Sequence, residues 1–285
     1  MTTPTSAEAS VRPSTAFSRA EPSAAVSPAG TSINPAMYGR KPRPSAFDGR
    51  SSQQAAPALR RYEVACLNAR GDIETSSHIA PAIPLFEAAV SAFARGTLIS
   101  TPTGEVAIED LLPGDEILTG RGNASPVQWI GSTTFRPDRP SSQSSITHMT
   151  RVMADAFGIS RPSSYMMAGP AARILHTPDH LRASAGAQKM LTPLRGFVDG
   201  ENVIDVTPPA PIELFHLCLK HHAIIFAGGL EVESYHPGTG ASTEVSHNLR
   251  QIYLSMFDHI HHLADFGPMI YPHAPGARYH DASAL

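Results

Sequence analysis

The chain has 285 residues, which is enough for one or two domains at about 150 residues each. A formal net charge of -3 and a pI near 6.5 exclude a general electrostatic attraction to nucleic acid or to an anionic membrane surface. The two cysteines, Cys66 and Cys218, are too few for a disulfide framework and leave no CxxC spacing for zinc.

The N-terminal region has the composition of an unfolded leader. Residues 1–60 are rich in Ser, Ala, Pro and Thr, and bury too little apolar surface to offset chain entropy. They contain no apolar stretch of signal-peptide length, and no part of the chain approaches the roughly 18 apolar residues of a membrane helix. We expect a disordered leader on a soluble protein that is cytoplasmic by default or exported by a non-classical route.

Residues 61–91 are predicted to hold a short strand and a linker. Tyr62, Val64 and Cys66 alternate with polar residues, which is typical of a strand, and a turn follows at residues 70–72. Residues 81–90 are interpreted as a linker or a helical turn.

From Phe93 onward, short apolar runs alternate with turn residues. The β-branched enrichment of these runs predicts strands, and the lack of helical periodicity between them argues against a βαβ fold. The sequence therefore predicts an all-β fold, barrel-like or sandwich-like. The strands are expected in TLIS, EVAIEDL, EILTG and VQWIGS, and then at residues 172–175, 181–183, 203–206, 213–219 and 223–226.

Residues 239–285 are predicted to be a helical extension. Between residues 244 and 264, apolar side chains recur at three- and four-residue steps, which predicts one amphipathic helix docked on the β-domain. His259 and His262 would then share a helical face that Asp265 continues. Ligands in line along one helix need a partner from elsewhere to enclose a metal. We interpret this row as a polar face and predict neither a metal nor a cofactor.

Two blocks of sequence carry a family resemblance. The first begins FARGTLI at Phe93 and continues with TGEVAIEDL, PGD and VQWIG; the second begins ILHTPDH at residue 174 and continues with FHL, FAGGL and ESY. Together they resemble bacterial Hint domains, the autoprocessing fold of hedgehog C-terminal regions and inteins. The resemblance covers residues 92–238 and implies an all-β Hint fold of short pseudo-symmetric hairpins.

The resemblance also implies an active site. A cysteine at the first domain residue attacks the carbonyl before it, and this sequence has Ala92 there. Thr177 would position the scissile peptide, and His180 would protonate the departing amide nitrogen, although a buried structural histidine is the alternative. His216 and His222 are second-rank candidates, since packing in strands explains them equally well.

Ala92 has three explanations: a decayed site, a deliberate substitution, or an attack on the Ser91–Ala92 bond by another group. Ser91 is the nearest hydroxyl, but adjacent side chains of a strand point to opposite faces. Two hypotheses follow. The chain is a single-turnover autoprocessing module that acts on its own N-terminal segment, has an unidentified acyl acceptor, and is deficient as written. Alternatively, it is a non-catalytic interaction or structural module. Neither involves nucleic acid or a membrane.

Overall fold

The computed structural model describes residues 58–139, 141–178, 188–238 and 246–274. Within these ranges the chain is mostly β-strand with a few short helices, and the named strands pair with one another antiparallel. The predicted all-β fold is confirmed. The predicted leader lies almost wholly outside the described residues, and the first strand begins at Leu59.

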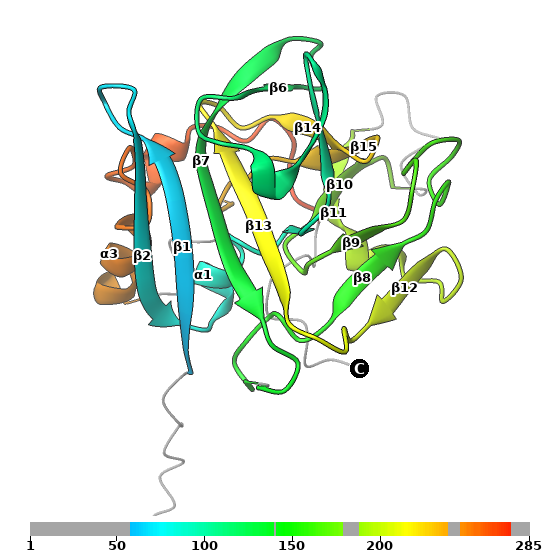
Figure 1. Cartoon of the computed structure of the whole chain (residues 1–285), viewed down its shortest axis with the longest axis horizontal. Coiled ribbons are helices and arrows are strands. Elements are labelled where there is room, and N and C mark those ends of the chain that lie inside the picture. Colours follow the sequence, from blue (N-terminus) through cyan, green and yellow to red (C-terminus); the bar gives the residue numbers. More distant parts are fainter. Residues whose placement is uncertain (1–57, 140, 179–187, 239–245, 275–285) are drawn as a thin grey trace, which may run out of the picture. The chain divides into compact units, whose positions relative to one another are not determined.

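The larger sheet has nine strands in the described part of the chain, in the order β12-β8-β9-β3-β13-β7-β1-β2, with β6 paired to β7 (Figure 1). Its strands are β1 (Leu59–Leu67), β2 (Ile73–Pro81), β3 (Phe93–Ala94), β6 (Glu116–Leu118), β7 (Ala124–Phe135), β8 (Met149–Val152), β9 (Met166–Ala168), β12 (Val203–Val206) and β13 (Ile212–Leu219).

The second sheet has six strands, in the order β11-β10-β15-β14-β4-β5. Its strands are β4 (Leu98–Thr101), β5 (Gly104–Ala107), β10 (Arg173–His176), β11 (Met190–Pro193), β14 (Ile224–Ala227) and β15 (Leu230–Glu233). The helical elements are α1 (Pro84–Glu87), α3 (His247–Leu254) and the 3₁₀ turns η1 (Ile108–Asp110), η2 (Leu194–Phe197) and η3 (Leu263–Phe266). None of the helices found within these ranges is long and apolar enough to cross a bilayer.

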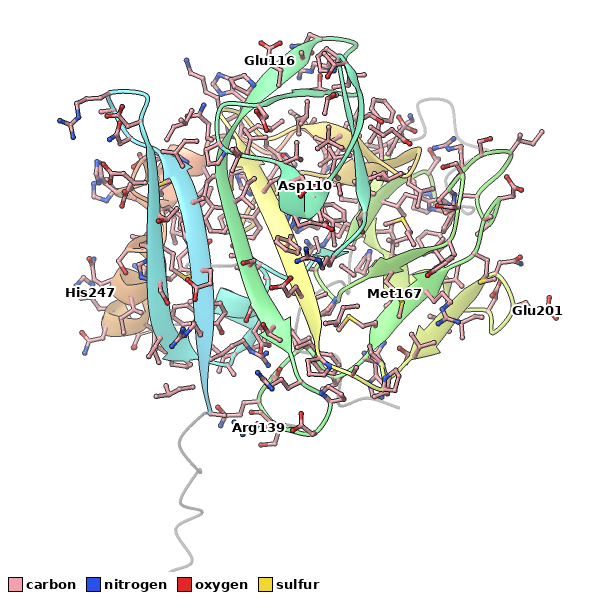
Figure 2. The ribbon with its side chains drawn as sticks, viewed as in Figure 1. Asp110, Glu116, Arg139, Met167, Glu201 and His247 are labelled. Atoms are coloured by element: carbon pink, nitrogen blue, oxygen red, sulfur yellow. The ribbon has the colours of Figure 1, made fainter. Side chains whose placement is uncertain are left out.

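Most strands lie where apolar runs predicted them. The runs at 172–175, 203–206, 213–219 and 223–226 correspond to β10, β12, β13 and β14, whereas the predicted strand at 181–183 lies outside the described residues. Charged side chains such as Glu116, Arg139 and Glu201 are exposed at the periphery (Figure 2).

The segment 59–81 forms a long hairpin rather than one strand and a linker. Tyr62, Val64 and Cys66 are all buried, as their alternation predicted. The partner strand β2 was missed, because most of its residues are exposed and polar and show no apolar alternation. It pairs with β1 along its whole length, from Leu59 opposite Pro81 to Leu67 opposite Ile73.

The C-terminal helix is shorter than predicted. It spans His247–Leu254 and not residues 244–264 (Figure 1), and its Tyr253 and Leu254 are buried in one hydrophobic cluster with Tyr62 of β1. Just beyond its end, the Trp129 indole N–H donates to the Met256 carbonyl over 2.6 Å, and Phe257 stacks on the indole ring at 4.5 Å. The apolar residues that suggested a longer helix are therefore buried by turns packed on Trp129, so tertiary packing overrides helical periodicity.

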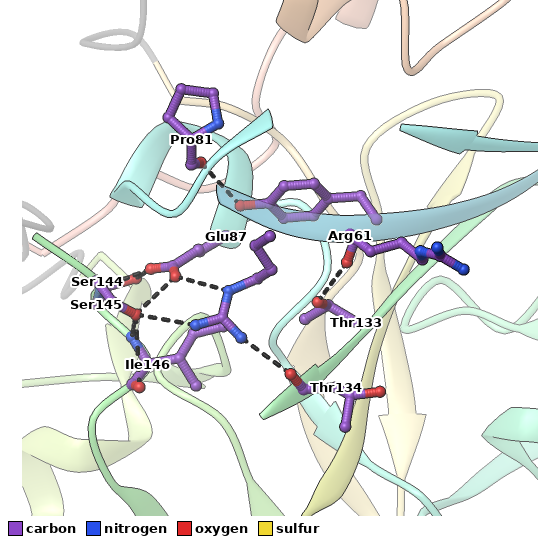
Figure 3. Close-up of polar contacts among 10 residues, drawn as sticks. Arg61, Pro81, Glu87, Thr133, Thr134, Ser144, Ser145 and Ile146 are labelled. Atoms are coloured by element: carbon purple, nitrogen blue, oxygen red, sulfur yellow. Dashed lines mark hydrogen bonds and ion pairs between the residues drawn. The ribbon is translucent and has the colours of Figure 1, made fainter. Parts of the chain in front are cut away.

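A buried carboxylate fixes the segment before residue 92 (Figure 3). Glu87 ends α1 and is fully buried. Its Oε1 accepts from Arg60 Nε at 3.1 Å and from Ser144 Oγ at 2.6 Å, and its Oε2 accepts from the backbone N–H of Ser145 at 2.6 Å and its hydroxyl at 2.7 Å. Arg60 also donates to the Thr134 carbonyl at 2.9 Å. The buried carboxylate of Glu87 is thus paired with the largely buried guanidinium of Arg60, as a charge removed from water requires.

We expect Glu87→Ala to lower the free energy of unfolding by about 3 kcal/mol, because it strands a largely buried Arg60 without its partner. Chemical denaturation measures the loss, with Glu116→Ala at an exposed position as the control. A loss in Glu87→Ala no larger than in the control would contradict this account.

Candidate functional site

The backbone around residue 92 is held from two sides. Ala92 is fully buried, and its N–H donates to the Phe215 carbonyl of β13 at 3.0 Å. On the other side, Gly169 N–H donates to the Ala92 carbonyl at 2.9 Å, and Ala171 N–H donates to the Ser91 carbonyl at 3.1 Å. The peptide at which the sequence analysis places the reaction is therefore fixed by backbone hydrogen bonds at each end.

These three backbone hydrogen bonds, which we call the backbone clamp, depend on a glycine. A Cβ atom at Gly169 would lie 2.1 Å from the Ser91 oxygen and 2.9 Å from its carbonyl carbon. No side chain can be accommodated at that separation, so only glycine allows this close approach. The backbone of the turn at residues 169–171 therefore packs directly against the Ser91 carbonyl.

Gly169→Ala should lower the free energy of unfolding by about 3 kcal/mol, since the added methyl must push the Ser91 carbonyl from its hydrogen bond. Gly196→Ala is the matched control, because a Cβ there would meet its nearest neighbour, Thr192, at an ordinary 3.8 Å. Thermal or chemical melts of both variants test the difference, and equal stabilities would contradict the clamp.

The position predicted for the nucleophile, residue 92, holds only the methyl group of an alanine. The Ser91 hydroxyl next to it is buried and has no hydrogen-bond partner among the residues that the structure describes. A serine nucleophile is activated by a base within hydrogen-bond reach. Within the described ranges, the geometry gives Ser91 no such base.

Thr177 follows the end of β10 and is half-buried. It lies six residues after Ala171, so one segment carries both the donor to the Ser91 carbonyl and the threonine of the predicted site. His180 lies outside the described residues, as do residues 179–187. Its role as proton donor stays a prediction.

His216 lies beside the residue that follows Ala92. Its buried ring meets Phe93 edge-on at 5.5 Å and Tyr235 at 5.3 Å. Its Nδ1 accepts from the N–H of Leu217 at 3.1 Å, so the proton of the neutral ring is on Nε2. Burial lowers the pKa of His216 to about 3. It is therefore neutral at pH 7 and unsuited to donate a proton as an imidazolium.

His222 belongs to a different environment, a buried charge cluster centred on Glu233. Glu233 Oε2 pairs with Arg173 at 3.0 Å, and Oε1 lies 3.1 Å from His222 Nε2 and 2.7 Å from His273 Nε2. The N–H of Ile270 donates to His222 Nδ1 at 3.1 Å, which places the His222 proton on Nε2, facing the carboxylate. Burial would raise the pKa of Glu233, but Arg173 and the two histidines hold it well below its usual range.

No sequence pattern pointed to a role for Arg173, Glu233 or His273. Glu233 stands in the ESY segment and ends a strand, and a carboxylate at the end of a partly apolar strand was the signal that could have found this cluster. The cluster joins β10, β15 and the segment around His273. The contacts of His222 are with this cluster, whereas the ring of His216 meets Phe93, the residue after Ala92.

The unfolding free energy should depend on the pH through His216. The unfolded chain protonates this ring below its ordinary pKa of 6.5, while the folded protein keeps it neutral to about pH 3. Stability therefore falls as pH drops below 6.5. The pKa of Glu233 is also lowered in the folded protein, although there the charged form is the one that is stabilised. Its contribution to stability is present above its ordinary pKa of 4.5 and is lost at lower pH, so stability again falls as the pH drops.

Between pH 6.5 and 4.5, His216→Phe should make the fall in unfolding free energy shallower by up to about 1.4 kcal/mol per pH unit, the value for one proton. Denaturant melts across this range measure the slope. His148→Phe at an exposed position is the control and should leave the slope unchanged. An unaltered slope in His216→Phe would contradict the neutral buried ring.

The C-terminal histidines do not form the helical row considered above. The helix ends before them, and Asp265 instead accepts from the backbone N–H groups of His261 and His262 at 2.9 and 2.8 Å, capping η3. In the described ranges no group of three or more His, Cys, Asp or Glu side chains is arranged to hold a metal.

These features define an antiparallel β-module built around one buried internal peptide. Residues 91–239, just over half of the chain, match the Hint domain family, and the chain belongs to that family. The resemblance inferred from the sequence is thus confirmed.

Among solved structures, the MchDnaB-1 intein is 17% identical, with a TM-score of 0.30 over 50% of this chain and 100% of its own. The bacterial intein-like domain from Clostridium thermocellum is 13% identical, with a TM-score of 0.31 over 51% of this chain and 99% of its own. No curated protein matches the chain.

Proposed function

We propose that residues 92–238 form an autoprocessing module whose substrate is its own peptide bond between Ser91 and Ala92. As written, the module is deficient in the first step, because Ala92 replaces the nucleophile. The observation that carries the proposal is the clamp on this bond: Ala171 N–H donates to the Ser91 carbonyl at 3.1 Å, inside a chain of the Hint family.

The proposed reaction with a cysteine at residue 92 is an acyl shift. The thiolate attacks the Ser91 carbonyl carbon, and the carbonyl oxygen takes up negative charge beside the Ala171 N–H, which stabilises it. The carbon–nitrogen bond then breaks, and His180 supplies the proton that the leaving amine takes. Water, a thiol or an alcohol then cleaves the resulting thioester, which releases the chain that ends at Ser91 and frees the thiol at residue 92.

The alternative function is a non-catalytic interaction or structural module that keeps the Hint fold. It is favoured by the packing of Ala92, whose methyl lies in a hydrophobic cluster with Phe93, Ile99 and Phe215. In this alternative, the side chain at residue 92 contributes to the hydrophobic core and has no part in a reaction.

Ala92→Cys is expected to restore cleavage in the presence of dithiothreitol, releasing a piece that ends at Ser91. Intact-mass measurement and a denaturing gel detect it. Burial raises the pKa of Cys66 to about 11 and that of Cys218 well above its usual value, so neither native thiol competes.

Ala94→Cys is the matched control, since Ala94 is equally buried on β3 and should stay intact. Adding His180→Ala to Ala92→Cys should slow cleavage at least about a hundredfold, the usual contribution of a general acid. If folded Ala92→Cys stays uncut, the interaction module becomes the better account.

A further inference from the structure

The residues before the Ser91–Ala92 bond are built into the fold. β1 is an interior strand of the larger sheet, paired with β2 on one edge and with β7 on the other (Figure 1). Its pairing with β7 runs from Glu63 opposite Ser132 to Cys66 opposite Trp129. Backbone hydrogen bonding thus crosses between the segment before the cut and the segment after it.

Side chains from both segments share one hydrophobic core. Phe86 meets Tyr62 at 5.9 Å and Tyr253 at 6.1 Å, so residues from before and after the bond contact one another. Burying this much apolar surface stabilises an association in the same way as it stabilises a fold. The core cluster contains Tyr62, Val64, Cys66, Ala80, Phe86, Ala88, Ala89 and Val90 from before the bond, and Trp129, Cys218, Tyr235, Tyr253, Leu254, Met256, Phe257, Ile260 and Phe266 from after it.

A buried polar contact adds specificity to this apolar one. The Arg60–Glu87 pair lies before the bond, and its remaining hydrogen-bonding groups are satisfied by Thr134, Ser144 and Ser145, which lie after it (Figure 3). If residues 58–91 dissociated, Arg60 and Glu87 on one side and the groups at residues 134, 144 and 145 on the other would lose their hydrogen-bond partners.

We propose that β7, the loop at 144–146 and the C-terminal residues 253–257 form a binding surface for the N-terminal hairpin and α1. A cut between Ser91 and Ala92 then yields a non-covalent two-chain protein, in which everything N-terminal to the cut stays attached. The cut itself rests on the proposed function, but the binding surface does not.

A cut that is independent of the acyl shift tests the retention of β1; β2 and α1 stay joined to the remainder, so β1 is then held by β2 as well as by β7. A protease recognition sequence is placed in the exposed β1–β2 turn at residues 70–72, and the nicked full chain is run on native size-exclusion chromatography. We expect the fragment carrying β1 to co-elute with the remainder and to separate only in denaturant. Separation without denaturant would overturn the inference.

Two neighbouring arginines provide the specificity test. The side chain of Arg60 is 14% exposed and pairs with buried Glu87, whereas the side chain of Arg61 is 70% exposed and lies 3.8 Å from the exposed carboxylate of Glu63. In the nicked protein, Arg60→Ala should weaken retention of the β1 fragment by about a hundredfold, and Arg61→Ala should leave it unchanged. Equal retention in both would contradict the polar part of the surface.

The Ala92→Cys variant separates the two proposals. A denaturing gel reports whether the bond is cut, and native size exclusion reports whether the pieces remain together. An uncut variant whose turn-nicked form keeps its β1 fragment refutes the proposed cleavage alone. A cut variant whose pieces separate refutes the retention alone.

Discussion

The backbone contact between Gly169 and the Ser91 carbonyl is so close that no Cβ atom fits between them. It allows the turn at 169–171 to place one N–H on the carbonyl of Ser91 and another on that of Ala92. β3 has only two residues, yet it lies between β13 and β9 because the peptide before it is held in this way. The proposed acyl shift would use a bond fixed to this degree, since positioning supplies much of a rate enhancement.

Two buried carboxylates connect the flanking segments to the Hint core. Glu87 binds Arg60 and the two serines at 144 and 145, and so fixes the segment before the bond. Glu233 binds Arg173, His222 and His273, and so fixes the segment that follows α3. Such pairs add little net stability, but breaking one leaves an uncompensated charge in the interior. Their effect is to select one arrangement of each segment.

In this arrangement, the proposed cleavage would not by itself release the N-terminal segment. In the proposed reaction the covalent bond at residue 91 breaks, while the β1–β7 pairing and the aromatic core around Trp129 persist. The surroundings of residue 92 are equally compatible with a module whose present role is to hold its N-terminal segment. Both functions use the same backbone clamp, and they differ only in whether a nucleophile is present at the clamped bond.

Local patterns in the sequence determined the strand-rich class, the strand at Tyr62–Cys66, several strands after residue 172, and the Hint resemblance with Ala92 at its start. They could not reveal β2, whose polar residues form a strand only because β1 pairs with them. Nor could they reveal the early end of α3, which depends on Trp129 binding the Met256 carbonyl. The clamp by Gly169 and the Glu233 cluster join residues distant in the chain, so only tertiary structure decided them. Alternation and turn chemistry are local, whereas close approach and charge pairing depend on which segments meet.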